Sequence, residues 1–304
     1  MIKLKLVSLF FLSFAIFGQS KKTDTIRLFY LGGQSNMDGY GFNKDLPDNL
    51  NTEFKDVYIF HGNPAPDEAE NGGEGVWQKL KPGHGKGFSS NSKQNNLSDR
   101  FGVELSFAKK IKELYPNDKI AIIKYSRAGT SIDSIIAREF GSWEPDFKGK
   151  NGLNQYDHFL KTLNNALKTI DIDENGKTDV VIPTGILWMQ GESDALDEQV
   201  AFRYFDNLKR LMDLIRASFR TDDLPVVLGK ISDSWDSPEG KVWPYGELVQ
   251  YAQEKLVKSD INTAIVRTTR YYKYSDTWHY DSAGYIDLGQ QFAESLYMLS
   301  KTKF

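Results

Sequence analysis

A serine stands where the chain is expected to turn sharply from a strand into a helix. Ser35 lies in the stretch Leu31-Gly32-Gly33-Gln34-Ser35-Asn36-Met37-Asp38-Gly39, directly after an apolar run at residues 26–31 that predicts a buried strand. Backbone N–H groups at such a turn are free of partners and favour a developing negative charge. An ordinary Gly-Ser turn is equally compatible with this stretch, so the rest of the chain must decide.

Asp276 and His279 offer the other two groups of a hydrolytic triad. Neutral imidazole is well populated near pH 7, so His279 can take the proton of a serine hydroxyl. Asp276 can accept a hydrogen bond from the other ring nitrogen and stabilise the imidazolium. Asp-x-x-His alone is weak evidence, and a surface histidine is the common alternative. The Asp276–His279 motif becomes a stronger candidate because it lies after the last expected strand and before the final helix.

Three groups are candidates for stabilising the oxyanion of a tetrahedral intermediate. They are the backbone N–H groups of Ser35 and Gly129 and the side-chain amide of Gln190. The alternative for Gln190 is a loop amide bonded to backbone. Glu192 and Asp194 suggest a second chemistry, glycoside hydrolysis by two carboxylates. We disfavour it, because residues two apart on a turn seldom face each other across a sugar.

Strands and helices are expected to alternate along the chain. Apolar runs predict strands at residues 26–31, 57–60, 120–124, 180–188, 225–231 and 263–266, and apolar residues at helical spacing predict helices at 103–114, 159–170, 205–219, 245–257 and 282–299. This order predicts an α/β fold with a mostly parallel sheet covered by helices on both faces. Because ligands bind outside the carboxyl ends of such strands, the segments at Ser35, Gly129, Gln190 and after Val266 should converge.

Composition narrows the possible functions. The 304 residues, 40% of them hydrophobic, suit one large α/β domain. A net charge of −3 provides no basic surface for nucleic acid or an anionic membrane. The absence of cysteine excludes disulfides and thiol catalysis, and no two of the four histidines have metal-ligand spacing. We therefore expect neither a metal nor another cofactor. The sequence does not indicate the oligomeric state.

The first residues resemble a signal peptide. Lys3 and Lys5 precede an apolar run at residues 6–17, which is too short to span a membrane. A membrane anchor or a buried first strand is the alternative. We expect residues 1–20 to be a signal peptide, residues 21–304 to be the catalytic domain, and the protein to be secreted or periplasmic. No later apolar segment is long enough for a membrane span.

Residues 61–99 and 233–246 are expected to be loops that decide specificity. The first is rich in turn residues, and loops of this length are usually functional or disordered. Trp77, His84 and Phe88 either line a site or pack the loop against the domain, and we slightly favour packing.

Four motifs in this order resemble the SGNH hydrolase superfamily in its sialate O-acetylesterase-like branch, which includes the acetylxylan esterases of carbohydrate esterase family six. They are Gly33-Gln34-Ser35-Asn36-Met37, Gly129-Thr130-Ser131-Ile132, Trp188-Met189-Gln190-Gly191-Glu192-Ser193-Asp194 and Asp276-Thr277-Trp278-His279. The resemblance spans about residues 26 to 298. Four separated motifs make it specific.

The resemblance implies a flavodoxin-like three-layer αβα sandwich and hydrolysis of O-acetyl esters on sugars. It assigns the nucleophile to Ser35, the base to His279 and the orienting acid to Asp276. It assigns the oxyanion donors to Ser35, Gly129 and Gln190.

Two departures from the wider superfamily are typical of the acetylesterase branch. Gly-Gln-Ser-Asn replaces Gly-Asp-Ser-Leu, and Gln190 replaces the usual oxyanion asparagine. Within the motifs, Gln34, Asn36 and Glu192 are supporting candidates. Residues 102–104 also resemble a motif of this branch, and Glu104 is expected to support the site without an assigned role.

We therefore expect a secreted serine esterase that acts on an acetylated glycan, either a polysaccharide or sialic acid. The alternative is a catalytically silent carbohydrate-binding protein that uses exposed aromatics such as Trp143, Trp235 and Trp243. The enzyme is favoured, because a binding module has no need of a serine, a histidine and an aspartate together. The sequence does not identify the glycan.

Overall fold

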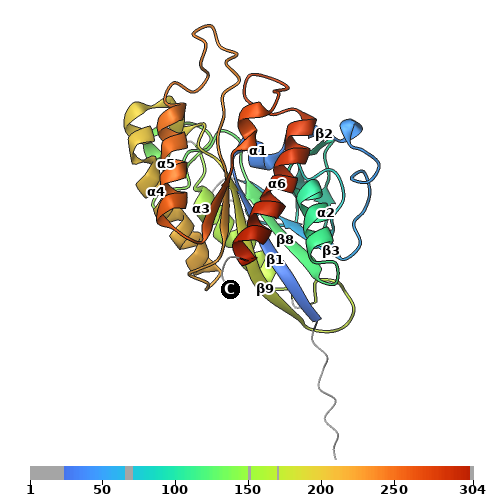
Figure 1. The fold of residues 1–304 in the computed structure, drawn as a ribbon. Helices are drawn as coiled ribbons and strands as arrows, with labels where there is room; N and C mark the ends of the chain where they lie inside the picture. Colours follow the sequence, from blue (N-terminus) through green and yellow to red (C-terminus); the bar gives the residue numbers. More distant parts are fainter. Residues whose placement is uncertain (1–23, 66–70, 150–151, 170, 302–304) are drawn as a thin grey trace, which may run out of the picture.

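Three layers make up the protein in a computed structural model that describes residues 24–65, 71–149, 152–169 and 171–301 (Figure 1). The central sheet has seven strands in the order β11-β10-β9-β1-β8-β3-β4. Its strands are β1 (Asp24–Gly33), β3 (Val57–His61), β4 (Gln78–Lys79), β8 (Lys119–Ser126), β9 (Asp179–Met189), β10 (Val226–Gly229) and β11 (Thr263–Val266). β4 pairs antiparallel with β3, and the other neighbours are parallel. The predicted α/β fold with a mostly parallel sheet is confirmed.

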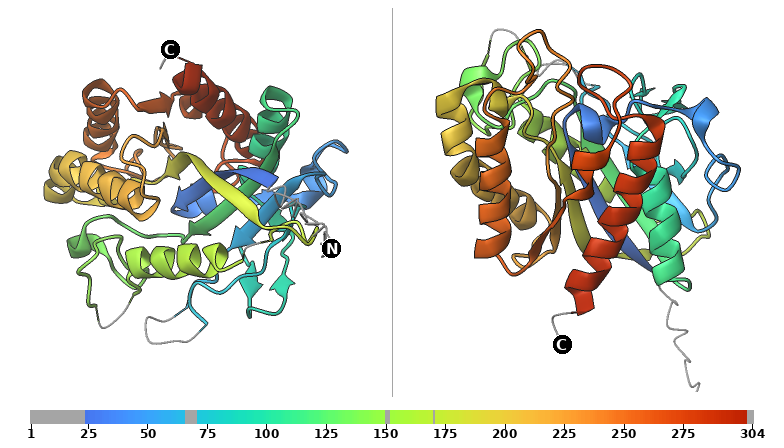
Figure 2. Two further views of the ribbon diagram at one scale, coloured as in Figure 1. Left: turned by 90° about the horizontal axis from the view of Figure 1, so that it is seen from below. Right: turned by 45° about the horizontal axis from the view of Figure 1, so that its top comes forward.

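Helices cover both faces of this sheet (Figure 2). The long helices are α2 (Glu104–Leu114), α3 (Gln155–Leu167), α4 (Glu198–Ser218), α5 (Gly246–Ser259) and α6 (Ser282–Lys301). α2 and α6 pack together on one face, while α3, α4 and α5 lie on the other. These are the five helices that the sequence predicts. Among the described residues, no helix has the length and apolar character needed to cross a membrane.

Smaller elements surround the carboxyl ends of the strands. They are the helix α1 (Ser35–Asp38), the pairs β2 (Gly41–Phe42) with β7 (Arg100–Phe101) and β5 (Ser89–Ser90) with β6 (Asn95–Asn96), and 3-10 turns at Asn43–Asp45, Ser134–Ile136, Asp194–Leu196 and Thr268–Tyr271. Four of the strands, β4 to β7, lie in or next to the region that we expected to be one long loop. Strands of two residues have no detectable periodicity, so sequence patterns could not predict them.

The strand β9 is irregular at the proline that its sequence contains. Its register with β1 shifts between Leu28 and Phe29, opposite Pro183 and Gly185. Proline has no N–H for the ladder, so pairing is interrupted there and resumes beyond it. From Phe29 onward the two strands run in register to Gly33 and Met189, which fixes the edge of the sheet where the site lies.

The predicted signal peptide, residues 1–20, lies outside the described residues.

Candidate active site

The segments that follow β1, β8, β9, β10 and β11 meet at one edge of the sheet, where the sequence predicts convergence. Gly33 at the end of β1 is paired with Ser126 at the end of β8 and with Met189 at the end of β9. A cavity of about 410 Å³ opens there. Its walls include four of the predicted site residues, namely Gln34, Ser35, Gly129 and His279.

Ser35 is held against the end of β9 by a close backbone contact. Gly33 has φ of +143°, and a Cβ on it would lie 2.0 Å from the carbonyl oxygen of Met189. Only glycine fits there, and the N–H of Gln34 then donates to the same carbonyl at 2.9 Å. The next residue, Ser35, begins α1 and is 6% exposed. Its own N–H, at the start of a helix, has no intrahelical acceptor.

His279 has the orientation that a general base requires. Its Nδ1 lies 2.8 Å from Oδ2 of Asp276, so the ring presents Nε2 on its other side. Oδ1 of Asp276 accepts the backbone N–H groups of Trp278 and His279, each at 2.8 Å. The ring of Tyr40 stacks on the imidazole with 3.5 Å between centroids. These contacts fix both the rotation of the ring and the nitrogen that carries the proton.

The pKa values of His279 and Asp276 are shifted in the direction that suits a base and its orienting acid. Burial lowers the pKa of His279 below its ordinary value, although the Asp276 carboxylate opposes that shift. Burial alone would raise the pKa of Asp276, but the hydrogen bonds from His279 and the N–H of Trp278 outweigh it and hold this pKa below its ordinary value. Near neutral pH the imidazole is therefore neutral and the carboxylate ionised.

Asn36 ties the serine helix to the loop that carries His279. Its Nδ2 donates to Oε1 of Glu192 at 2.8 Å and to the carbonyl oxygen of Trp278 at 3.2 Å. Its Oδ1 accepts from the hydroxyl of Tyr285 at 2.8 Å. Asn36 is 1% exposed, so its amide has no capacity left for a substrate. It acts behind the site, by setting the distance between the first and last motifs.

The two acidic residues of the third motif, Glu192 and Asp194, make hydrogen bonds within the protein. Burial raises the pKa of Glu192 to about 7 and that of Asp194 to about 6. Asp194 accepts the N–H groups of Ile132 and Asp133 at 3.0 to 3.1 Å. Neither carboxylate lines the cavity. Glu192 and Asp194 are therefore not placed to act as the two carboxylates of a glycoside hydrolase.

Glu104 supports the far end of the serine helix through a buried ion pair. Its Oε2 accepts from Nζ of Lys124 at 2.8 Å, and both side chains are fully buried. The same ammonium donates to the carbonyl oxygens of Asp38, at the end of α1, and of His84. Oε1 of Glu104 accepts the N–H of Gly102 at 2.9 Å. The predicted supporting residue thus acts through Lys124, which clamps α1 to the neighbouring loop.

Gln190 does not reach the cavity. Its Nε2 donates to the carbonyl oxygen of Thr130 at 3.2 Å and to Oδ2 of Asp194 at 2.5 Å, and its Oε1 accepts from the hydroxyl of Tyr204 at 2.9 Å. The side chain is fully buried and both amide hydrogens are used. In this structure both amide hydrogens are therefore bonded within the protein, and the role of Gln190 as an oxyanion donor stays a prediction. The alternative reading, a loop amide bonded within the protein, fits.

Gln34 presents the amide that Gln190 does not. Its Oε1 accepts the backbone N–H groups of Gly191 at 3.2 Å and Ser193 at 3.4 Å. The residue is 3% exposed and lines the cavity next to Ser35. With the carbonyl side of the amide turned toward the third motif, the NH₂ side is left for the cavity. The sequence marked Gln34 as supporting, and its adjacency to the serine was the available sign of a larger role.

Gly129 also lines the cavity and must be glycine. Its φ is +76°, and a Cβ would lie 2.5 Å from the ring of Phe140. The side chain of Arg138 donates to the carbonyl oxygen of Gly129 at 3.1 Å and to Oγ of Ser193 at 3.3 Å. These contacts hold the second predicted oxyanion donor beside the cavity.

The aromatic residues divide into a packing group and a cavity group. Trp143 is fully buried, so the prediction that it is an exposed platform for sugars is wrong. Trp77 donates Nε1 to the carbonyl oxygen of Ala166 and packs on the core. Trp243 and Trp278 line the cavity, and Trp278 is 51% exposed. The sequence did not single out Trp278 as a platform.

An acidic cluster lies at the opposite end of β1. Asp24, Asp173 and Asp179 bring their carboxylates within 4.8 Å of one another. The ammonium of Lys119 donates to Asp24 at 2.7 Å and also to Asp173, so two of the three already have a cation. The cluster is not part of the cavity.

Comparison with known proteins agrees with this geometry. Residues 25–298 match the family described as "Carbohydrate esterase, sialic acid-specific acetylesterase". Among the solved structures with a similar fold is a protein from Arabidopsis thaliana, which has 21% sequence identity and a TM-score of 0.62, with 90% of this chain and 98% of that chain covered. A carbohydrate acetylesterase from Xanthomonas citri has 16% identity and a TM-score of 0.61, with 90% of this chain and 57% of that chain covered. NanS has 17% identity and a TM-score of 0.58, with 92% of this chain and 99% of that chain covered. At these identities they support the fold. No curated protein sequence matches the chain.

Proposed function

We propose a serine-esterase mechanism from one premise: the chain belongs to the family of carbohydrate esterases that are described as sialic acid-specific acetylesterases. The predicted acetylesterase family is thereby confirmed, and the protein is a carbohydrate O-acetylesterase. The observation that carries the mechanism is the hydrogen bond between His279 and Asp276 at a cavity that Ser35 also lines.

The reaction proceeds through an acetyl-enzyme. Oγ of Ser35 attacks the acetyl carbonyl while Nε2 of His279 takes the hydroxyl proton. His279 then gives this proton to the departing sugar oxygen as the ester bond breaks. Water, deprotonated by His279, attacks the acetyl group on Ser35; the bond to Oγ then breaks, His279 returns its proton to Oγ, and acetate is released. Asp276 holds the imidazole in place and stabilises its charged form in both halves of the reaction.

Three donors stabilise the oxyanion in this proposal. They are the N–H groups of Ser35 and Gly129, which the sequence indicated, and the NH₂ group of Gln34 in place of that of Gln190. All three residues line the same cavity. A donor that is already fixed by the protein needs no reorganisation when the charge develops.

Replacing Gln34 by alanine should lower kcat by about 10²–10³-fold with little change in KM, because an oxyanion donor acts mainly on the transition state. Steady-state kinetics on an acetyl ester measure this. Gln190→Ala is the matched control: it should lower the free energy of unfolding by about 1–3 kcal/mol, because it leaves buried partners unpaired, and should affect kcat less. A change in KM alone would make Gln34 a substrate-binding residue, and a larger kcat loss for Gln190→Ala would restore the original assignment.

The substrates are short acyl esters of sugar hydroxyls. A cavity of about 410 Å³ has room for an acetyl group and a sugar ring, while long acyl chains need a dedicated apolar groove. Trp278, which is 51% exposed, offers a flat face to the sugar. Trp243 also lines the cavity but is only 8% exposed, so the prediction that it is an exposed aromatic is wrong.

Acetate release from acetylated xylan, acetylated pectin and O-acetylated sialic acid tests the substrate class. We expect release from at least one of them, and faster cleavage of acetyl esters than of esters with acyl chains of about eight carbons. Faster cleavage of the long-chain esters would overturn this proposal. Sugar binding without any acetate release would favour the silent carbohydrate-binding alternative.

We also propose that the enzyme is exported from the cytoplasm. The lysines and the apolar run at residues 3–17 support a signal peptide, which would place the enzyme where acetylated glycans are met outside the cytoplasm.

A further inference from the structure

An exposed tryptophan lies on the loop between β10 and α5, outside the reaction cavity. Trp235 is 61% exposed and is not among the residues that line that cavity. Of the three tryptophans that the sequence suggested as exposed aromatics, only this one is exposed, because Trp143 and Trp243 are buried. Figure 1 shows the loop at the top of the view, where it projects beyond the carboxyl ends of the strands.

The backbone at Trp235 has a conformation that favours glycine. Its φ is +59°, in the left-handed region, where a bulky side chain is an outlier. The N–H of Trp235 donates to Oδ1 of Asp233 at 2.7 Å, and the same carboxylate accepts the N–H groups of Val242 at 3.1 Å and Trp243 at 2.9 Å. These bonds close the loop at its base and maintain the strained conformation. Backbone strain of this kind is concentrated at active sites and ligand-binding sites.

The loop covers one face of the Trp235 indole with its own residues. Nζ of Lys241 lies over the ring, 5.6 Å from its centroid. Gly240 is next to the ring, since a Cβ there would lie 3.8 Å from Cε3 of the indole. Because the residue is still 61% exposed, the other face of the ring is open to solvent. An open indole face on a hydrogen-bonded loop suits the apolar C–H face of a sugar ring.

Hydrogen bonds fix Trp235 relative to the loop that carries His279. Oγ of Ser234 donates to the carbonyl oxygen of Thr277 at 2.7 Å, and Oγ1 of Thr277 donates to Oδ2 of Asp236 at 3.1 Å. Both neighbours of Trp235 in the sequence are therefore bonded to the residue that directly precedes Trp278. The two exposed indoles lie on adjoining segments, one lining the cavity and one outside it.

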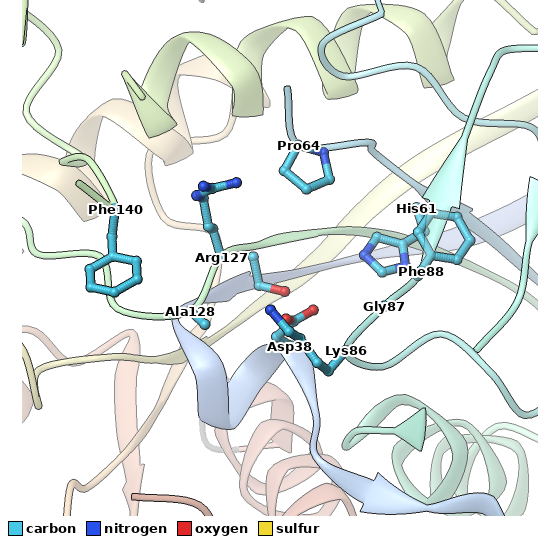
Figure 3. Close-up of a pocket in the computed structure, with 10 residues that line it drawn as sticks. Asp38, His61, Pro64, Lys86, Gly87, Phe88, Arg127, Ala128 and Phe140 are labelled. Carbon is cyan, nitrogen blue, oxygen red and sulfur yellow. The ribbon is translucent and has the colours of Figure 1, made fainter. Parts of the chain in front are cut away.

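The wall of the reaction cavity continues onto this loop. Val242 and Trp243, at the base of the loop, line the cavity. A smaller cavity of about 230 Å³ adjoins the reaction cavity at Ala128 and Phe140, and its lining among the described residues contains no tryptophan (Figure 3). A sugar chain that stacks on indole rings would therefore leave the reaction cavity along the loop, toward Trp235.

We propose that Trp235 binds a second sugar of the substrate, next to the acetylated one, so that the enzyme prefers acetylated sugar chains to single acetylated sugars. The inference rests on the proposed function, since it extends the substrate outward from the ester at Ser35. The acetylated sugar lies in the reaction cavity beside Trp278, and its neighbour stacks on the open face of Trp235. Stacking uses the C–H face of the ring, so the second sugar needs no charge and no acetyl group.

The test compares each acetylated sugar alone with the same sugar in a chain. The pairs are mono-O-acetylated methyl xyloside with mono-O-acetylated xylotriose, mono-O-acetylated methyl galacturonoside with mono-O-acetylated trigalacturonate, and mono-O-acetylated N-acetylneuraminic acid with sialyllactose that is O-acetylated on its sialic acid. For the sugar that the enzyme deacetylates fastest, we expect kcat/KM for acetate release to favour the chain by about 10-fold. Equal values for the chain and the single sugar would overturn the proposal.

Trp235→Ala should remove this preference, and Trp235→Phe should retain most of it because an aromatic face remains. Trp235→Gly is the sharpest variant. It should also remove the preference, but its Tm should be no lower than that of the parent, because glycine adopts a positive φ without strain. A lower Tm with an unchanged preference would instead make Trp235 a residue needed for folding.

Tyr251→Ala is the matched control. Tyr251 lies on α5, is 69% exposed and is not among the residues that line either cavity. We expect its preference for the chain to equal that of the parent. A preference that survives Trp235→Ala, or that falls equally in Tyr251→Ala, would overturn the proposal. So would a Trp235→Ala change from dimer to monomer in size-exclusion chromatography with the preference unchanged, since the indole would then lie between two copies of the chain.

Calorimetry separates this proposal from the proposed function. Unacetylated xylotriose, trigalacturonate and sialyllactose are titrated into the Ser35→Ala protein with and without Trp235→Ala. If one of them binds and Trp235→Ala weakens its binding by about 10-fold, the second sugar site stands even if the parent enzyme cleaves no acetyl ester. If the parent enzyme is active but Trp235→Ala weakens the binding of none of them, the second sugar site is wrong and the esterase mechanism is unaffected.

Discussion

Ser35→Ala should lower kcat/KM for acetyl esters by at least about 10³-fold while leaving the protein folded, because no other group can then attack the carbonyl. His279→Ala should lose nearly as much, since Ser35 remains protonated without its base. The double variant should be little worse than either single one, because the residues act as one unit. Turnover of a chromogenic acetyl ester by the four proteins measures this, with thermal unfolding to confirm the fold.

Ser193→Ala is the control for this series. Its hydroxyl lines the same cavity but accepts a hydrogen bond from Arg138 and has no base beside it. We expect a far smaller loss than for Ser35→Ala. If Ser193→Ala were the inactive variant and Ser35→Ala retained activity, the nucleophile would have to be reassigned.

Asp276→Asn should lower kcat by up to about 10⁴-fold and should also move the pH profile. The base must be neutral, and the pKa of His279 is lowered by burial, so the parent enzyme should reach half-maximal kcat/KM below a pH of about 6.5. The Asp276 carboxylate opposes that lowering. Its removal should therefore shift the midpoint further toward acid while the maximum falls. The kcat/KM of both proteins between pH 4 and pH 8 measures the shift.

Asp236→Asn is the matched control for Asp276→Asn. Asp236 accepts a hydrogen bond from Thr277 of the same loop at 3.1 Å but does not touch His279. We expect its pH profile to match that of the parent enzyme. Full activity of Asp276→Asn, or a midpoint shifted toward alkali, would mean that another group orients the histidine.

The sequence predicted the sheet, the helices and the convergence of the motifs because each rests on regular patterns. Apolar runs and helical spacing place the strands and helices, and a parallel sheet brings the carboxyl ends of its strands to one edge. Ser35, Gly129 and His279 all line the cavity, since each lies in the segment that follows such a strand.

Side-chain direction within a loop was beyond the reach of sequence patterns. Gln34 and Gln190 are both amides at a strand end, and only the folded hydrogen-bond partners reveal which faces the cavity. The sequence favoured Gln190, but Asp194 four residues later takes its amide hydrogen. Trp143 was misread for the same reason, because nothing local distinguishes a buried loop tryptophan from an exposed one.

Sequence patterns also did not predict the smaller cavity next to the reaction cavity, which Lys86 and Arg127 line. Lys86 and Arg127 are forty-one residues apart and belong to no motif that we recognised, yet both line the same hollow. Their proximity depends on the path of the segment between β3 and β7, which has too little regular structure for a pattern to predict.

The central claim is that Ser35 carries the acetyl group, and mapping the covalent adduct tests it most directly. The active protein is treated with a fluorophosphonate and, separately, quenched with acid during turnover of an acetyl ester, and its peptides are analysed by mass spectrometry. The mechanism predicts the phosphonate and the acetyl group on Ser35, loss of acetate release in step with phosphonate labelling, and no adduct in the His279→Ala protein. Either adduct on another serine, or full acetate release by protein labelled on Ser35, would contradict it.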